Sequence, residues 1–234
     1  MDIKSPVGEA RNTYTYTADG IKRKTLQQWN SNYSTTPVIG TGINVSSLNL
    51  SKTTDYAGNI IYENGSLKRI LIEGGYIEGG VYYFYLTDHL GNNRVVANSS
   101  GAMIQKTHYY PFGMAFAEST DQGKQPYKYN GKEFDQMHGL NLYDYSARYM
   151  EPTLGRFTTV DPLAEKYYSV SPYVYVVNNP VRNIDFRGDS VTVLNLGTGT
   201  NQHMALLIQN KEGKWQYFSF NGDKVYQAYR SRKF

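Results

Sequence analysis

Short segments of alternating hydrophobic and polar residues, separated by glycine, asparagine, aspartate and proline, run along most of this chain. Alternation with a period of two places every second side chain on one face of a β-strand. Tyr-x-Tyr pairs begin at residues 14, 127, 143 and 173, and each is followed by a turn residue. The pattern therefore predicts a mainly β protein. The rings of Tyr143 and Tyr145, and those of Tyr173 and Tyr175, are each predicted to lie on one strand face. Within residues 141–190 the pattern leaves room for at most one helical turn, near residues 163–166.

Three dipeptides predict tight hairpins between such segments: Asp19-Gly20, Asn64-Gly65 and Asn221-Gly222. Both residues of each dipeptide tolerate the positive φ that two-residue hairpin turns require. Residues 81–86 predict a continuous aromatic strand, whereas residues 25–55, rich in serine, threonine and asparagine, predict loop and weak strands. One hairpin cannot bury a face by itself, so lateral stacking of neighbouring hairpins must supply the core.

Composition and charge support this fold class and exclude several functions. The 234 residues include 23 tyrosines, and tyrosine gives a strand a large apolar body with a polar tip, suited to a half-wet sheet face. The net charge is +4, and the basic residues are spread along the chain with no block of five or more, so nucleic-acid binding is not predicted. The absence of cysteine excludes disulfides, thiolate metal ligands and a cysteine nucleophile within the chain.

Neither a targeting segment nor a metal or cofactor site is predicted. The first residues lack the apolar stretch of a signal peptide, and no run approaches the ~20 apolar residues of a membrane helix. The four histidines are scattered, whereas a metal site needs three or four convergent ligands, so His89 is interpreted as a turn residue. Residues 197–200 lack the Gly-Lys-Ser/Thr ending of a phosphate-binding loop, and the adhesion-like tripeptide at 187–189 is interpreted as coincidence.

Several blocks of turn residues and aromatics at fixed offsets carry a resemblance to a known family. The blocks are Asp88-His-Leu-Gly-x-x-Arg94, Tyr109-Tyr-Pro-Phe-Gly113, Asn141-Leu-Tyr-Asp-Tyr145, Pro152-Thr-Leu-Gly-Arg-Phe157, Asp161-Pro162, Tyr173-Val-Tyr-Val-Val-Asn-Asn-Pro180 and Asp185-Phe-Arg-Gly188. Together they resemble the RHS-repeat-associated core domain of the RHS/YD-repeat family, in its Bacteroidetes-like style. The resemblance covers residues 56–190 and, more weakly, a YD-like repeat at 14–24.

This resemblance implies stacked β-hairpins that form part of a YD-repeat spiral sheet or shell, with a small β-rich C-terminal tip. We expect a weak YD-like repeat and linker at 1–55, the core domain at 56–190, and a variable, possibly truncated tip at 191–234. The implied function is structural: to encapsulate and deliver a C-terminal toxin in competition between bacteria. Implied partners are the rest of the shell or the chain's own tip, and an immunity protein. The implied location is secreted or at the cell surface, by an export route outside this chain.

Asp161 and Asp185 are the first candidates for catalysis. In some RHS-type proteins the core releases its tip by aspartyl self-cleavage after an Asp-Pro-x-Gly block, with which Asp185-Phe-Arg-Gly188 aligns. Two carboxylates that share one proton supply an acid and a base side by side, and the bond to be cut is then Asp189–Ser190. Phe186 stands in place of the family's proline, however, and Asp189 in place of an apolar residue. The favoured alternative is that both aspartates only cap turns.

Two other functions stay open. His203 begins an apolar strand in a segment similar to the His-first, permuted papain-like hydrolase tips of the family, where a histidine serves as base for a thiol. Because the chain has no thiol, we favour a truncated tip or a structural histidine at a strand end. In the other alternative, the tyrosine-rich faces form a carbohydrate-binding or adhesion surface, since aromatic rings stack on sugars.

Overall fold

The computed structural model describes residues 1–5, 8–33, 38–39, 42–119, 125–166, 169–189, 192–195, 204–209, 215–221 and 224–228, with backbone alone for 38–39, 117–119, 166 and all residues after 191. Regular structure in these residues is antiparallel β-sheet, in three sheets, together with short 3-10 turns. None of the helical turns within these ranges has the length and apolar character to cross a membrane. The predicted mainly β class is confirmed.

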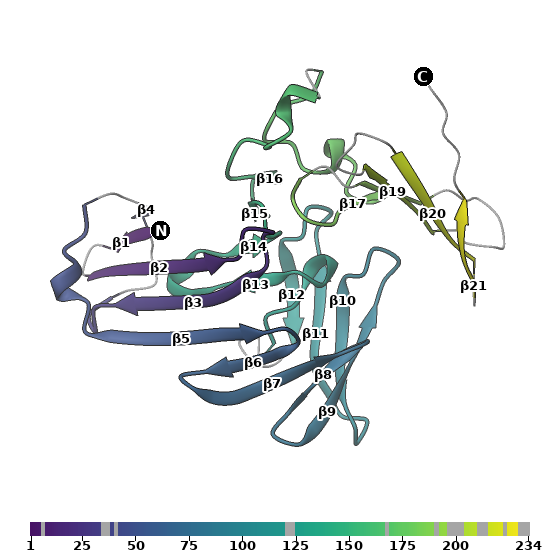
Figure 1. Ribbon diagram of the computed structural model, residues 1–234. Coiled ribbons are helices and arrows are strands. Elements are labelled where there is room, and N and C mark those ends of the chain that lie inside the picture. The colour runs from purple at the N-terminus through teal and green to yellow at the C-terminus, as the bar shows by residue number, and fades with distance from the viewer. Residues whose placement is uncertain are drawn as a thin grey trace.

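The largest sheet has twelve strands that follow one another as a meander (Figure 1). The turns at Asp19-Gly20 and Asn64-Gly65 join β2 to β3 and β6 to β7, as predicted. The predicted stacked hairpins are therefore confirmed. The strands are β1 (Asp2–Ser5), β2 (Gly8–Tyr16), β3 (Lys22–Trp29), β4 (Val38–Ile39), β5 (Leu50–Ala57), β6 (Ile60–Glu63), β7 (Ser66–Ile72), β8 (Gly75–Glu78), β9 (Val81–Thr87), β10 (Asn93–Asn98), β11 (Met103–Tyr109) and β12 (Ala115–Ser119), with β4 pairing with β1 at one edge.

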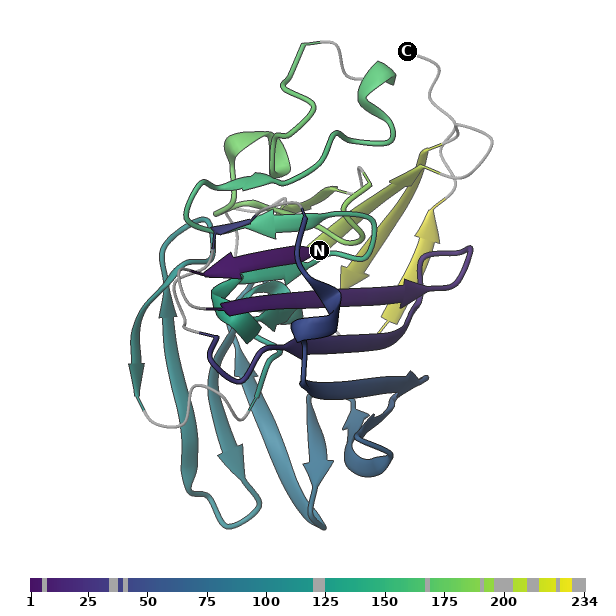
Figure 2. The ribbon, with the colours of Figure 1, turned by 90° about the vertical axis from the view of Figure 1, so that its left-hand side faces the viewer.

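This sheet curves, and a compact unit, which we call the cap (residues 125–189), lies against its inner face (Figures 1 and 2). Tyr14 and Gln27 face the cap and hydrogen-bond Asp135 there. Residues on the other face of β9 are exposed, among them Tyr82, Phe84 and Leu86. Tyrosine suits these strands because its ring packs against neighbours while its hydroxyl forms a hydrogen bond across the interface with the cap.

The cap contains a sheet of four short strands, four 3-10 turns and the first strand of a further sheet. Its strands, in sheet order, are β13 (Glu133–Asp135), β14 (Leu142–Asp144), β15 (Tyr149–Glu151) and β16 (Arg156–Phe157), and its turns are η2 (Tyr129–Gly131), η3 (Met137–Gly139), η4 (Ala164–Lys166) and η5 (Val176–Asn178). Its core is largely aromatic: Tyr109 of β11 packs with Tyr129, Tyr143, Tyr145, Met150, Phe157, Tyr175 and Val176. Burial of each such large side chain contributes roughly 1.5–3 kcal/mol relative to exposure.

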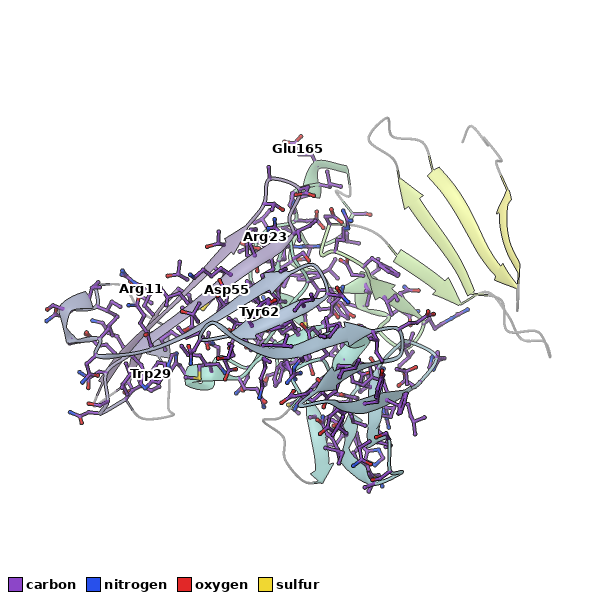
Figure 3. All side chains as sticks on the ribbon, turned by 60° about the horizontal axis from the view of Figure 1, so that its bottom comes forward. Arg11, Arg23, Trp29, Asp55, Tyr62 and Glu165 are labelled. Carbon is purple, nitrogen blue, oxygen red and sulfur yellow. The ribbon has the colours of Figure 1, made fainter. Side chains whose placement is uncertain are left out.

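The third sheet has five strands and begins at the end of the cap. Its strands are β17 (Asn183–Asp185), β18 (Thr192–Asn195), β19 (Met204–Gln209), β20 (Trp215–Asn221) and β21 (Lys224–Ala228). Figures 1 and 3 show β19–β21 projecting to one side of the twelve-stranded sheet. The ladder between β17 and β18 pairs Asp185 with Thr192, so this sheet begins on a strand of the cap.

Three predictions about local structure were wrong. Tyr173 and Tyr175 do not share a strand face: Tyr175 is fully buried, Tyr173 is 37% exposed, and η5 begins one residue later. Residues 25–55 contain more strand than expected, since β3 and β5 pair over six residues from Lys24 to Trp29. The polar residues of β3 are compatible with a strand because they contact polar residues of the cap. The periodicity of the local sequence carries no information about these distant partners. More than one helical turn is present, although the predicted one at 163–166 exists as η4.

Candidate functional site

Arg148 lies where three segments of the cap meet. It sits in the turn between β14 and β15, and its side chain is 2% exposed. Its Nη2 donates to Asp161 Oδ2 at 2.7 Å, and its Nη1 donates to the Pro172 carbonyl at 3.2 Å. Its Nε donates to the Gly188 carbonyl at 2.5 Å. The guanidinium also stacks on Phe157, with its carbon 3.7 Å from the ring centroid. One cation therefore holds the end of the cap together.

Burial lowers the pKa of Arg148, while Asp161 and Asp185 act in the opposite direction. A guanidinium has so high an ordinary pKa that it stays charged at neutral pH even when its pKa is lowered. Removing Arg148 would accordingly leave carboxylates and carbonyls without their cation in a region of low dielectric.

The structure brings the two candidate aspartates, Asp161 and Asp185, to the same atom. Nη2 of Arg148 lies 2.7 Å from Asp161 Oδ2 and 3.8 Å from Asp185 Oδ2. Each aspartate also caps a turn with its other oxygen. Asp161 Oδ1 accepts the Leu163 N–H at 2.7 Å, and Asp185 Oδ1 accepts the Arg187 and Gly188 N–H groups at 3.0 and 2.6 Å.

This arrangement supports ion pairing and turn capping directly. Burial raises the pKa of Asp185, although the backbone N–H groups and Arg148 oppose the rise. A shared cation favours two ionised carboxylates, whereas a proton-sharing dyad needs one of them protonated. Chemistry between Asp161 and Asp185 thus remains a prediction.

A second polar cluster is built from tyrosine hydroxyls around Asn130. The hydroxyls of Tyr145 and Tyr175 lie 2.9 Å apart, and both donate to Asn130 Oδ1, at 2.8 and 2.6 Å. Burial raises the pKa of both tyrosines well above the ordinary value, so both stay protonated donors. Asn130 has a positive φ of 50°, a conformation that asparagine tolerates better than most residues.

Asn130 links this cluster to the turn that precedes β10. Its Nδ2 donates to the Leu90 carbonyl and to Asn92 Oδ1, at 2.9 and 3.1 Å. Asp88 shapes that turn, because its Oδ1 accepts the N–H groups of Leu90 and Asn92. His89 contacts the Val181 carbonyl of the cap at 3.2 Å. The Asp-His-Leu-Gly block is therefore a turn that joins the sheet to the cap, as predicted for His89.

Lys22 at the start of β3 is a cation in the interface between the sheet and the cap. Its Nζ lies 3.0 Å from Asp144 Oδ2 and 3.1 Å from Glu133 Oε2. The Nζ atom also lies over the rings of Tyr14 and Tyr56, 5.4 and 5.2 Å from their centroids. Burial by itself lowers the pKa of Lys22, but the carboxylates outweigh burial and raise it overall. Lys22 is thus a fixed positive charge between sheet and cap.

A cleft of about 360 Å³ opens beside Lys22. The turns that precede β3 and β6, the segment 131–133, and the 144–147 turn line it, together with Arg187 and Asp189. It contains both cations and carboxylates, without a cluster suited to a metal: no group of three or more histidine, aspartate or glutamate side chains converges among the described residues.

Comparison with known families decides what these motifs belong to. The family model of the Teneurin YD-shell matches residues 47–181. The chain belongs to the YD-shell family. The predicted RHS/YD-repeat membership is therefore confirmed, and the matched range contains β5 to β16 together with Arg148 and Asp161, but ends before Asp185.

Similar proteins include bacterial toxins and nucleases. The YD-shell chain is 27% identical over 190 residues to "Toxin subunit YenC1" of Yersinia entomophaga, covering 72% of this chain and 18% of that protein. It is 33% identical over 159 residues to "tRNA3(Ser)-specific nuclease WapA" of Bacillus spizizenii, covering 64% of this chain and 7% of the nuclease. The chain spans between 3% and 18% of the length of the curated relatives it matches.

Solved structures give the same fold. The crystal structure of a TcdB2-TccC3-Cdc42 protein aligns with 80% of this chain and 9% of its own, with a TM-score of 0.59 and 20% sequence identity. The structure of TcdB2-TccC3 aligns with 79% of the YD-shell chain, with a TM-score of 0.58 and 19% identity. At this identity the likeness establishes the fold.

Sequence reasoning missed the cations that organise this YD-shell. Arg148 and Asn130 were not predicted as site residues, and Lys22 was interpreted only as the basic end of the YD-like repeat at 14–24. A signal existed: each is a polar residue within a run of aromatics, where burial demands partners. His203 falls outside the described residues, so its role as a tip residue stays a prediction.

Proposed function

We propose that this chain forms the end of an RHS-type shell that encloses and delivers a C-terminal effector in competition between bacteria. Support comes from its curved sheet, whose inner face is closed by a cap, and from the path of the chain. That path passes through the Arg148 cluster immediately before the C-terminal residues. The toxin named among its relatives fits this function.

The proposed parts follow the predicted division: a weak YD-like repeat and linker at 1–55, the core domain at 56–190 and a variable tip at 191–234. Pairing of β17 with β18 means that the tip's sheet would start within the core domain. Proposed partners are further shell strands, the tip itself and an immunity protein, and the proposed location is secreted or at the cell surface. Sheet edges at β4 and β12 are suited to further strands, because an edge presents unpaired N–H and carbonyl groups.

Competition between cells tests the proposal. A producer strain carrying the gene should inhibit neighbours that lack the cognate immunity protein, and deletion of residues 191–234 should abolish inhibition. Mass spectrometry of the culture medium serves as control, since the shortened shell must still be exported. Undiminished inhibition by the deletion strain, with the shell exported, would contradict the proposed role of the tip.

We propose self-cleavage at Asp189–Ser190 by Asp161 and Asp185 as an alternative function of the chain. One carboxylate takes a proton from a water whose oxygen attacks the Asp189 carbonyl carbon. The other, protonated, gives its proton to the Ser190 nitrogen as the peptide bond breaks. The raised pKa of Asp185, caused by burial, supports it as the proton donor. His203 would contribute only to chemistry of the tip.

A denaturing gel measures this step. Wild-type protein at neutral pH should yield a fragment of about 189 residues that is absent from Asp185→Asn and Asp161→Asn, since an amide cannot exchange a proton in this way. The amide oxygen still accepts the turn's N–H groups, so the fold is kept. Asp55→Asn, at an exposed ion pair, is the matched control. An intact wild-type band would refute self-cleavage and leave the shell function standing.

A further inference from the structure

Three successive carbonyl groups of the chain, at residues 186, 187 and 188, are each bound by a donor of the cap. Lys132 Nζ donates to the Phe186 carbonyl at 2.6 Å. The Ala147 N–H donates to the Arg187 carbonyl at 3.0 Å, and Arg148 Nε donates to the Gly188 carbonyl at 2.5 Å. We call these three donors the carbonyl clamp.

The N–H groups of the same segment are bound as well. Asp185 Oδ1 accepts those of Arg187 and Gly188, so the main chain is held on both of its polar sides. Gly188 lies so close to the cap that a Cβ there would be 3.1 Å from Tyr145 Cβ, and its φ is +74°. By contrast, the side chains of Phe186 and Arg187 are exposed, at 48% for Phe186. The contacts are with main chain, not with these side chains.

Two donors of the clamp are side chains, and of these Lys132 is the one that does not also hold the Asp161–Asp185 cluster. Lys132 follows η2, whose last residue, Gly131, has a φ of 66°, and its ammonium lies 5.1 Å from the centre of the Tyr145 ring. Burial lowers the pKa of Lys132, and Asp185 and Asp144 partly offset that effect. An ammonium has three donors and no acceptor, so Lys132, which lines the cleft, suits a main-chain carbonyl.

We propose that the cap contains a binding site for a bent main-chain segment, which holds residues 186–188 by their carbonyl groups, and that Lys132 is its positioning residue. Because such a site reads carbonyl groups, it works with any side chains at the exposed positions and with any sequence after Asp189. The fold of the cap therefore does not depend on the sequence of the segment that follows it. This deepens the proposed function, on which its biological meaning rests.

Native-state trypsin cleavage of the Arg187–Gly188 bond in the full chain, followed by mass spectrometry, tests the clamp. Cleavage of a protected bond follows the population of the locally open form, so Lys132→Met should raise the rate by about tenfold. Lys132→Gln keeps an N–H donor and should raise it by no more than about threefold. Phe186→Ala removes a side chain but no carbonyl, and should stay within about twofold of wild type.

Cleavage after Lys68 on β7, remote in sequence, is the reference for general loosening. An increase in Lys132→Met confined to Arg187–Gly188 supports the clamp. Equal acceleration at both bonds, an unchanged rate in Lys132→Met, or acceleration by Phe186→Ala as large as by Lys132→Met would each overturn it. None of these rates depends on toxicity or export, so failure here is distinct from failure of the shell function.

Discussion

Replacing Arg148 by methionine should lower the free energy of unfolding by about 3–5 kcal/mol, the range for breaking a buried ion pair from one side. Asp161, Asp185 and the Gly188 carbonyl would lose their shared donor in a site where the Arg148 side chain is 2% exposed. Urea denaturation followed by circular dichroism measures the change. Methionine fills much of the volume, so loss of the charge dominates the result.

Two further variants separate charge from position. Arg148→Lys keeps the cation but loses the planar fork, and should fall between wild type and Arg148→Met. Adding Asp161→Asn to Arg148→Met should recover part of the loss, because one of the two unpaired carboxylates becomes neutral. Arg156→Met, at an exposed position of β16, is the matched control and should change stability by less than about 0.5 kcal/mol. A loss below about 1 kcal/mol for Arg148→Met would contradict the assigned role.

Much of the strand pattern was predictable because turn chemistry and alternation act locally. Tyr143 and Tyr145 are both fully buried in one cluster, as a strand-face pair should be. The hairpin turns at Asp19-Gly20 and Asn64-Gly65 formed because glycine accepts the positive φ there. These features need no knowledge of the distant chain.

The failures have a common physical cause in long-range contacts. Tyr175 left the strand pattern because its hydroxyl reaches Asn130, 45 residues away, and η5 follows at once. Asp161 and Asp185 meet only through Arg148, and no spacing along the chain predicts that shared partner. The sequence did indicate both aspartates as turn formers, and both do cap turns.

The position of Lys22 could not be predicted for a different reason: a β-bulge reverses the face of the sheet to which its side chain points. Thr15 pairs with Lys24 but Tyr16 pairs with Lys22, so Arg23 is an extra residue on β3. Figure 3 labels Arg23 on β3 and Asp55 on the neighbouring β5. Strict alternation from the buried Thr25 would point Lys22 away from the cap, whereas a β-bulge redirects the residues beyond it.

Lys22→Met is accordingly expected to destabilise the protein by about 3 kcal/mol at neutral pH. Without the ammonium, Asp144 and Glu133 face each other on paired strands of the cap, and like charges directly opposite are unfavourable. Thermal and urea unfolding of the variant give the loss. Lys24→Met, in an exposed pair with Asp55 at 3.7 Å, is the control on the same strand and should cost no more than about 0.5 kcal/mol.

The stabilisation by Lys22 should depend on pH in a defined direction. Because the folded-state pKa of Lys22 is raised, its contribution is fully present below the unfolded pKa and is lost only as pH rises through the folded one. The difference between wild type and Lys22→Met should therefore stay constant from about pH 6 to about pH 10. Burial also raises the pKa of Tyr16 and Tyr56, so these neighbours stay protonated over that range. A difference that vanished by pH 9 would mean that the buried ammonium does not join sheet to cap.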